Sequence, residues 1–282
     1  MATTTSTPKL NDTEFEALAK IIYDRSGIRF QLNRRYVLES RLGHRLRELE
    51  LESFDQYVAL LSMGPYQNDE FQEMFNRITI NETSFFRHDA QLEVFERTIL
   101  SEMLEARKST KRLRIWSAAC SSGEEPHTLA MMVHRTLGVR LADWRIEILG
   151  TDISERCLDI ATSGKYSDYA VRTTPDMIKR KYFEQQGTQW VLSDEIRQMV
   201  GFELHNLKDR MAAKRHGMWD IIFCRNAMIY FDEGMKQQVL RTFHDQLAED
   251  GTLFIGHSEV IRPEDAPFVA RPERSGFCYR KA

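Results

Sequence analysis

The apolar positions in the first part of the chain recur with the spacing of helices. Residues 11–27 pair a candidate cap, Asn11, with Glu14 three residues later and end at Gly27, which is the signature of a capped amphipathic helix. Further helical runs cover residues 34–49, 53–63 and 69–78. No strand pattern interrupts them. We therefore predict an N-terminal all-α domain over residues 1–89.

From about residue 112 the pattern changes to short apolar runs that alternate with helical ones. The runs that resemble buried strands are residues 113–118, 145–152, 219–226 and 251–259. The helical runs between them are residues 127–137, 155–164 and 234–249. Strands that alternate with helices predict an α/β fold with a doubly wound parallel sheet, here over residues 90–282. Ligands of such sheets bind outside the carboxyl ends of the strands.

Two segments depart from this alternation. Residues from about 177 to 203 carry aromatic and β-branched side chains around a Gln-Gln-Gly turn signal, which predicts a small antiparallel β-subdomain inserted into the larger domain. The last residues, 276–282, are typical of an added edge strand.

Composition narrows the class of protein. The 282 residues carry a formal net charge of -3, so no global charge favours nucleic acid. The first ten residues lack the features of a secretory signal, and no apolar run reaches the roughly 18 residues of a membrane span. The four cysteines form no CxxC pair and the histidines no metal-binding pattern. We expect a cytoplasmic protein with reduced thiols, without a metal site or membrane insertion.

The loop "WSAACSSGEEP", residues 116–126, follows the first predicted strand. Its small residues let a ligand approach the backbone, but a phosphate cradle would want several glycines and often a Lys. Glu124 and Glu125 would repel a pyrophosphate. Acids at a helix start also complement the helix dipole, an effect of about 0.3–1 kcal/mol, and this explanation stays open. The alternative is a ligand with positive charge and no phosphate.

Asp152 ends the second predicted strand. An acid at this position typically accepts hydrogen bonds from ribose hydroxyls, although it also suits the N-cap of the next helix. Together with a loop hostile to phosphate, Asp152 points to a cationic nucleoside, of which S-adenosylmethionine is the common one. The sulfonium and amino group would account for the acids.

Further polar clusters follow the other strands or precede the sheet. They contain Asn81, Thr83 and Arg87, then Asn206, then Arg225, Asn226 and Tyr230, and finally His257, Ser258 and Glu259. For Phe85, Phe86 and Tyr230 an ordinary core position is the simpler interpretation. For Arg87 and Arg225 it is an ion pair.

The motifs "NETSFFR", "RIWSAACSSGEEP", "TDIS", "HNL", "FCRNAMIYF" and "GTLFIGHSE" together resemble those of the CheR family of chemotaxis receptor methyltransferases, in order and spacing over nearly the entire chain. The resemblance implies a SAM-dependent methyltransferase sheet joined to a helical domain. It also implies methylation of glutamate side chains on the cytoplasmic helices of chemoreceptors, with S-adenosylhomocysteine as product. The cofactor residues that it implies are Asn81, Thr83, Arg87, Glu125, Asp152, Asn206, Leu207, Arg225 and Asn226. Glu125 is favoured over Glu124.

Methyl ester formation is an attack by a carboxylate oxygen on the methyl carbon of a sulfonium. Glutamate, with a reference pKa of about 4.3, is already ionised at neutral pH, so positioning should matter more than a general base. We hypothesise that Arg87 and Tyr230 orient the reacting groups. Two alternatives remain: a catalytically silent SAM-sensing or receptor-docking module, and, more weakly, a Rossmann dehydrogenase.

One segment of the chain is strongly basic, although the net charge of the whole chain is negative. Residues 25–47 hold seven arginines against the single acid Glu39. We expect Arg41, Arg45 and Arg47 to dock an acidic receptor helix, with a solvated basic face as the alternative. The β-subdomain looks too short to grip a C-terminal receptor pentapeptide, so we expect a member that does not depend on one.

Overall fold

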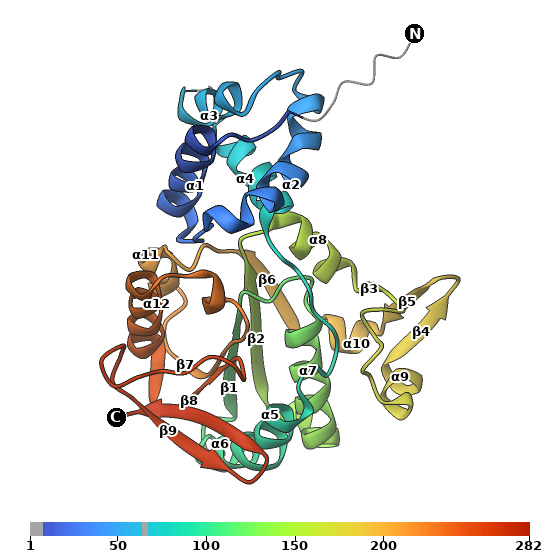
Figure 1. Cartoon of the computed structure of the whole chain (residues 1–282). Helices are drawn as coiled ribbons and strands as arrows, with labels where there is room; N and C mark the ends of the chain where they lie inside the picture. Colours follow the sequence, from blue (N-terminus) through green and yellow to red (C-terminus); the bar gives the residue numbers. More distant parts are fainter. Residues whose placement is uncertain (1–7, 64–66) are drawn as a thin grey trace. The chain divides into compact units, whose positions relative to one another are not determined.

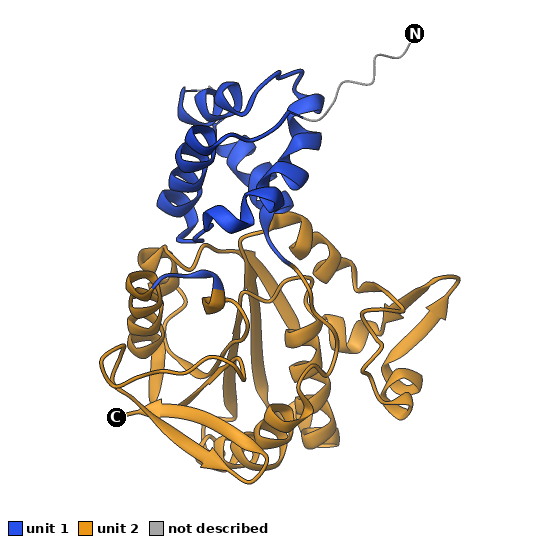
Figure 2. Ribbon diagram, viewed as in Figure 1, with its two compact units in different colours: residues 1–80, 230–232 blue, residues 81–229, 233–282 orange. Residues whose placement is uncertain are grey.

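The computed structural model describes residues 8–63 and 67–282, which fall into two compact units. One unit holds the chain up to Ile80 together with Tyr230–Asp232, and the other holds Asn81–Ile229 and Glu233–Ala282 (Figure 2). The division therefore falls after Ile80, where the sequence predicted it after residue 89. The difference arises because residues 81–87 hydrogen-bond to segments of the second unit.

The first unit is helical, as predicted. Its elements are α1 (Asp12–Ser26), the 3₁₀ turn η1 (Leu32–Arg34), α2 (Arg35–Glu48), α3 (Phe54–Met63) and α4 (Gln67–Ile78). The predicted capping box is present: Asn11 accepts from the Glu14 amide and Glu14 accepts from the Asn11 amide. Gly27 ends α1 with φ 75°, a conformation that favours glycine.

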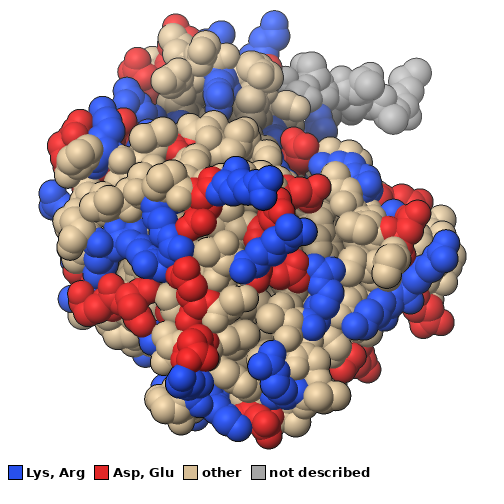
Figure 3. Space-filling model, turned by 90° about the horizontal axis from the view of Figure 1, so that it is seen from below, with Lys and Arg blue, Asp and Glu red and all other residues tan. Residues whose placement is uncertain are grey.

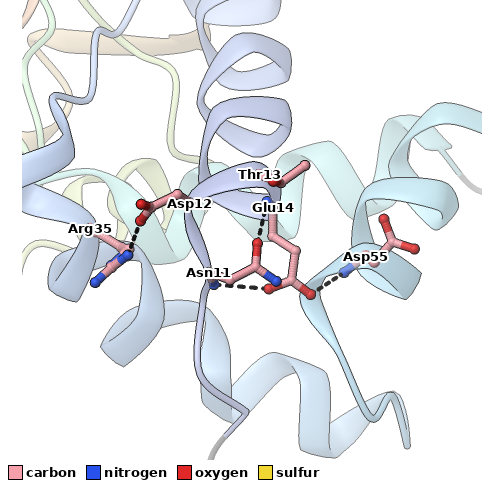
Figure 4. Close-up of a pocket in the computed structure, with 6 residues that line it drawn as sticks. All are labelled: Asn11, Asp12, Thr13, Glu14, Arg35 and Asp55. Atoms are coloured by element: carbon pink, nitrogen blue, oxygen red, sulfur yellow. Dashed lines mark hydrogen bonds and ion pairs between the residues drawn. The ribbon is translucent and has the colours of Figure 1, made fainter.

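Glu14 also joins two helices. Its Oε2 accepts from the Asn11 amide at 3.0 Å, and its Oε1 accepts from the Asp55 amide at the start of α3 at 3.1 Å (Figure 4). These residues line a shallow pocket with Asp12 and Arg35, which pair with each other. The polar groups of this pocket are thus used in capping and ion pairing, so we give the pocket a structural role.

The second unit is built on a seven-stranded sheet in the order β6-β2-β1-β7-β8-β10-β9 (Figure 1). Its strands are β1 (Arg112–Ala118), β2 (Arg145–Asp152), β6 (Val200–Leu204), β7 (Trp219–Cys224), β8 (Leu247–Ile255), β9 (Phe268–Glu273) and β10 (Gly276–Lys281). The pairs from β6 to β8 are parallel, and β10 pairs antiparallel with β8 and β9. The α/β fold is confirmed.

The helices of this unit are α5 (Asp89–Val94), the π-helical η2 (Phe95–Ile99), α6 (Leu100–Ala106), α7 (Glu124–Leu137), α8 (Glu155–Ser163), α9 (Asp176–Tyr182), α10 (Asp194–Arg197), α11 (Arg210–Lys214) and α12 (Glu233–Gln246). It also holds the 3₁₀ turn η3 (Gly138–Asp143) and the turn η4 (Met228–Tyr230) except for its last residue, Tyr230, which belongs to the first unit. The helices cover both faces of the sheet. Phe95 packs on Phe223 and Phe254 of one face, whereas Phe243 of α12 packs on Trp116 of the other. Successive strand residues point to opposite faces, and both faces are covered, so every residue of the central strand β7 is buried.

The predicted small antiparallel β-subdomain is confirmed, but its bounds differ from the prediction. β6, inside the segment predicted as an antiparallel insertion, pairs in parallel with β2. The small antiparallel sheet has the order β3-β5-β4, with β4 (Phe183–Gln186) and β5 (Gln189–Leu192) inside the predicted segment and β3 (Lys165–Ser167) before it. One edge of the large sheet is β6, and the other is β9, which no pattern predicted; the strand predicted as an edge at residues 276–282 is β10, which lies between β8 and β9. β9 contains Pro272, and an edge strand tolerates proline because one side of it needs no ladder hydrogen bonds.

No helix in the described part of the chain is both long and apolar enough to cross a membrane. All four cysteines are buried, and none of them forms a disulfide. On the face of the molecule seen in Figure 3, basic and acidic side chains are interspersed, so no single sign of charge dominates it.

Candidate active site

The loop after β1 curls back over the end of β2. Ala119, Ser121 and Gly123 have φ values of 60°, 51° and 88°, all in the left-handed region. A Cβ on Gly123 would lie 2.6 Å from the Cβ of Ala161, so only glycine fits there. The Cys120 amide donates to the Thr151 carbonyl at 2.8 Å. These contacts fix the backbone of the loop between the ends of β1 and β2 without the help of a ligand.

Asp152 ties this loop to the end of β2. Its Oδ2 accepts from the Ser121 amide at 2.7 Å and its Oδ1 from the Ser154 amide at 2.9 Å. Ser154 is the N-cap of α8, so the N-cap interpretation of Asp152 is wrong. Burial raises the pKa of the Asp152 carboxyl, and the backbone N–H donors oppose that rise. Asp152 stands at the carboxyl end of a parallel strand, the position expected of a ribose ligand.

Glu125 and Arg225 form a buried ion pair. Arg225 Nε lies 2.6 Å from Glu125 Oε2, and their side chains are 4% and 12% exposed. Ser117 donates to Glu125 Oε1 at 2.7 Å, and Arg225 Nη1 donates to the Arg87 carbonyl at 2.9 Å. Three predicted site residues from distant parts of the chain are therefore joined. The carboxylate has about four acceptor sites, so it retains capacity for a further donor.

Glu124 is engaged differently from its neighbour. Its side chain is buried, and both of its oxygens accept from the Ser122 hydroxyl, at 3.0 and 2.8 Å. Burial raises its pKa to about 7. The Thr128 hydroxyl donates to its carbonyl at 2.7 Å within the first turns of α7. Glu124 thus serves the loop and the helix start, and we keep Glu125 as the proposed cofactor contact.

The raised pKa of Glu124 gives a pH dependence of stability. In the folded state the carboxyl keeps its proton up to about pH 7, whereas the unfolded value is 4.5. The free energy of unfolding should therefore fall as pH rises between these two values, by up to about 3 kcal/mol. Glu124→Gln should remove this fall. Urea unfolding of both proteins at pH 5 and pH 8 measures it, and the same slope in both would contradict the assignment.

The segment with Asn81, Thr83 and Arg87 has no regular secondary structure and is held by its neighbours. The Phe85 amide donates to the Ala170 carbonyl at 2.9 Å, and the Phe86 amide donates to the Thr128 hydroxyl at 3.2 Å. Both aromatic side chains are buried, as predicted. The side chain of Arg87 donates to the Glu82 carbonyl at 2.7 Å.

The loop between β3 and α9 supplies contacts that the sequence did not reveal. Arg172 Nη1 donates to the Thr83 carbonyl at 3.3 Å, and its guanidinium lies 3.6 Å from the centre of the Tyr169 ring. The Tyr169 hydroxyl donates to Glu82 at 3.2 Å. Tyr169 and Arg172 do not follow a predicted strand and belong to none of the motifs quoted above, so no sequence pattern identified them. They fix the backbone that carries Thr83.

The remaining predicted residues follow β6 and β7. Asn206 Oδ1 accepts from the Lys208 amide at 3.0 Å, which shapes the turn that includes Leu207. Asn226 adopts φ 62° directly after Arg225. Tyr230 belongs to the helical unit, where its carbonyl accepts from the Arg29 amide at 2.9 Å. Its catalytic role stays a prediction.

The predicted docking arginines are used unequally by the helical unit. Arg41 donates to the carbonyls of Ile78 and Thr79, at 2.9 and 2.6 Å, and so caps α4. Arg45 binds both oxygens of the buried Glu70 at 3.1 and 2.6 Å. Arg47 is exposed. Charge reversal at Arg41 or Arg45 would therefore disturb helix packing as well as any docking surface.

The residues fit S-adenosylmethionine by the chemistry of their groups. Glu125 and Asp152 supply carboxylates for a cationic and hydroxyl-bearing ligand, and the first loop lacks the glycines and the Lys of a phosphate cradle. No group of three or more His, Cys, Asp or Glu side chains in the described residues is arranged to hold a metal ion.

Comparisons with known proteins identify the family of the chain. Residues 81–276 match the SAM binding domain of the CheR methyltransferases, and residues 13–79 match their all-alpha domain. The chain is 34% identical to chemotaxis protein methyltransferase 2 of Vibrio cholerae, over 96% of this chain and 94% of that protein. It is 36% identical to the chemotaxis protein methyltransferase of Escherichia coli K12, over 93% and 89%. The Borreliella burgdorferi protein of that name is 35% identical, over 88% of both chains.

Proposed function

Because the chain belongs to the CheR methyltransferase family, whose sheet domain binds S-adenosylmethionine, we propose that it methylates glutamate side chains of chemoreceptors. The products would be glutamate methyl esters and S-adenosylhomocysteine. The observation that supports the proposal best is the junction of Glu125, Arg225 and Arg87. Through Arg225, the Glu125 carboxylate, which suits a cationic cofactor, is connected to the backbone that carries the Arg87 guanidinium.

The chemistry asks for positioning more than for proton transfer. S-adenosylmethionine supplies an electrophilic methyl group on a sulfonium, and the substrate carboxylate is already ionised at neutral pH. We assign cofactor binding to Asn81, Thr83, Arg87, Glu125, Asp152, Asn206, Leu207, Arg225 and Asn226. Arg87 and Tyr230 orient the reacting groups in this proposal. Arg225 holds the Glu125 carboxylate in place, and through the Arg87 carbonyl it fixes the backbone that carries the Arg87 side chain.

The proposed partner is an acidic receptor helix that docks on the basic face of the helical unit. Arg47→Glu is expected to raise KM for the receptor several-fold, because an exposed charge affects association most. The dissociation constant for S-adenosylmethionine should not change. Steady-state kinetics with receptor-containing membranes measure both. Lys20→Glu, at an exposed position of α1, is the control for a charge change elsewhere on this unit. An unchanged KM for Arg47→Glu would remove Arg47 from the docking surface.

We also propose that docking does not depend on a C-terminal receptor pentapeptide. The turn between β4 and β5 is only Gly187–Thr188, so the small sheet has no long loop there to grip a peptide. Fluorescence titration with a labelled receptor C-terminal pentapeptide should show no binding at micromolar concentration. Saturation in that range would contradict this proposal.

The deciding experiment incubates the protein with methyl-labelled S-adenosylmethionine and receptor-containing membranes. Base-labile label on the receptor is the expected result, because glutamate methyl esters hydrolyse in base. Cofactor binding without transfer to any receptor would favour the alternative, a silent SAM-sensing docking module. That alternative shares the cofactor residues, so a binding measurement by itself would not separate the two.

A further inference from the structure

The loops that follow β7 and β8 are both bound by one buried carboxylate, that of Glu259. Glu259 is 7% exposed, whereas its neighbours Ser258 and Val260 are exposed. Glu259 Oε2 accepts from the Gly256 amide at 2.6 Å and from the Asn226 amide at 3.1 Å. Its Oε1 accepts from the Ile229 amide at 3.1 Å. One side chain thus satisfies three backbone donors of two separate loops.

The backbone around this carboxylate is adapted to it. A Cβ on Gly256 would lie 2.5 Å from Glu259 Oε2 and 2.9 Å from the Asn226 nitrogen, so only glycine permits this approach. Asn226 has φ 62°, in the left-handed region. Such a conformation persists where surrounding contacts enforce it, and the hydrogen bond to Glu259 is one of those contacts.

The sheet itself does not need Glu259. β7 and β8 already pair in parallel from Ile221 with Thr252 to Cys224 with Ile255. The end of β8 is held separately, since Gln91 Nε2 donates to the Ile255 carbonyl at 2.7 Å. All the donors to Glu259 lie beyond the paired residues of these strands. Its contacts therefore define where the loops run after the strands end.

We propose that Glu259 is a positioning residue of the methyl-transfer site, because it holds Asn226 and the start of the turn that leads to Tyr230. The inference rests on the proposed function, which gives Asn226 a cofactor contact and Tyr230 a place beside the reacting groups. Ile229, bound by Glu259, directly precedes Tyr230 in the chain, and both belong to η4. Glu259 itself touches neither cofactor nor substrate in this proposal.

Glu259→Gln tests the role with little change of shape. The amide replaces one acceptor oxygen by an NH₂ group, which would face backbone N–H donors. Either the Ile229 amide or the amides of Gly256 and Asn226 then lose their acceptor. We expect kcat to fall about tenfold or more and the Kd for S-adenosylmethionine to rise several-fold, because small misplacements of reacting groups are costly. KM for the receptor should change less than about twofold. Glu259→Asp keeps the charge and should recover part of kcat.

Glu264→Gln is the matched control. Glu264 is exposed and lies in the same segment, so kcat and the Kd should stay at wild-type values. A folded Glu259→Gln protein with wild-type kcat and Kd would overturn the inference. If that variant does not fold, wild-type kinetics of Glu259→Asp would overturn it instead. A wild type that binds S-adenosylmethionine but transfers no methyl group refutes the proposed function, and the Kd of the variant then still tests the placement of Asn226.

Discussion

Replacing Arg87 by alanine is expected to lower kcat for receptor methylation by about 100-fold, while the protein stays folded. The estimate follows from the role that we propose, a positioned guanidinium beside the reacting groups, for which losses of this order are typical. The fold should tolerate the change. The side chain makes a hydrogen bond of 2.7 Å to the Glu82 carbonyl at the surface, and the Arg87 carbonyl that binds Arg225 is kept by alanine.

The measurement is a full kinetic comparison with thermal unfolding alongside. Arg97→Ala is the control, because Arg97 of η2 is an exposed arginine that pairs with Glu93 of the preceding α5, at 2.9 Å. It should leave kcat unchanged. Turnover of Arg87→Ala within about threefold of the wild type would contradict the assignment of Arg87 to the reaction. A loss explained wholly by unfolded protein would contradict it as well.

Glu125→Gln is expected to have two large effects at once. The Kd for S-adenosylmethionine should rise about tenfold or more, because the carboxylate charge that favours a cation is gone. The free energy of unfolding should fall by about 3 kcal/mol, because Arg225, with its side chain 4% exposed, loses its counter-ion in a buried setting. Calorimetric titration at low temperature and urea unfolding measure the two effects separately.

Glu96→Gln is the matched control for this substitution. Glu96 pairs with Arg135 at 2.5 Å, but the two side chains are 21% and 42% exposed, so losing this charge should cost less than about 1 kcal/mol. Cofactor affinity should not change. A folded Glu125→Gln protein with wild-type affinity would remove Glu125 from the proposed cofactor site. A loss seen instead in Glu124→Gln would transfer the contact to Glu124.

The sequence by itself determined most of the architecture. Periodicity and caps located α1 from Asn11 to Gly27, because those signals are local. The central strands were found because parallel strands that are buried on both faces contain continuous apolar runs, such as residues 221–224 in β7. Strand ends then identified where polar site residues gather, since ligands of such sheets bind at that edge.

The tertiary structure alone decided which of these residues act on one another. No pattern in the sequence predicts that Glu125 pairs with Arg225 or that Arg172 binds Thr83, because the two partners lie on different strands or loops. The tertiary structure likewise distinguished the roles of two adjacent acids: Glu124 accepts a hydrogen bond from Ser122 at the start of α7, whereas Glu125 pairs with Arg225. The tertiary structure also placed β6 at one edge of the large sheet and β9 at the other, since strand pairing depends on contacts between residues far apart in sequence.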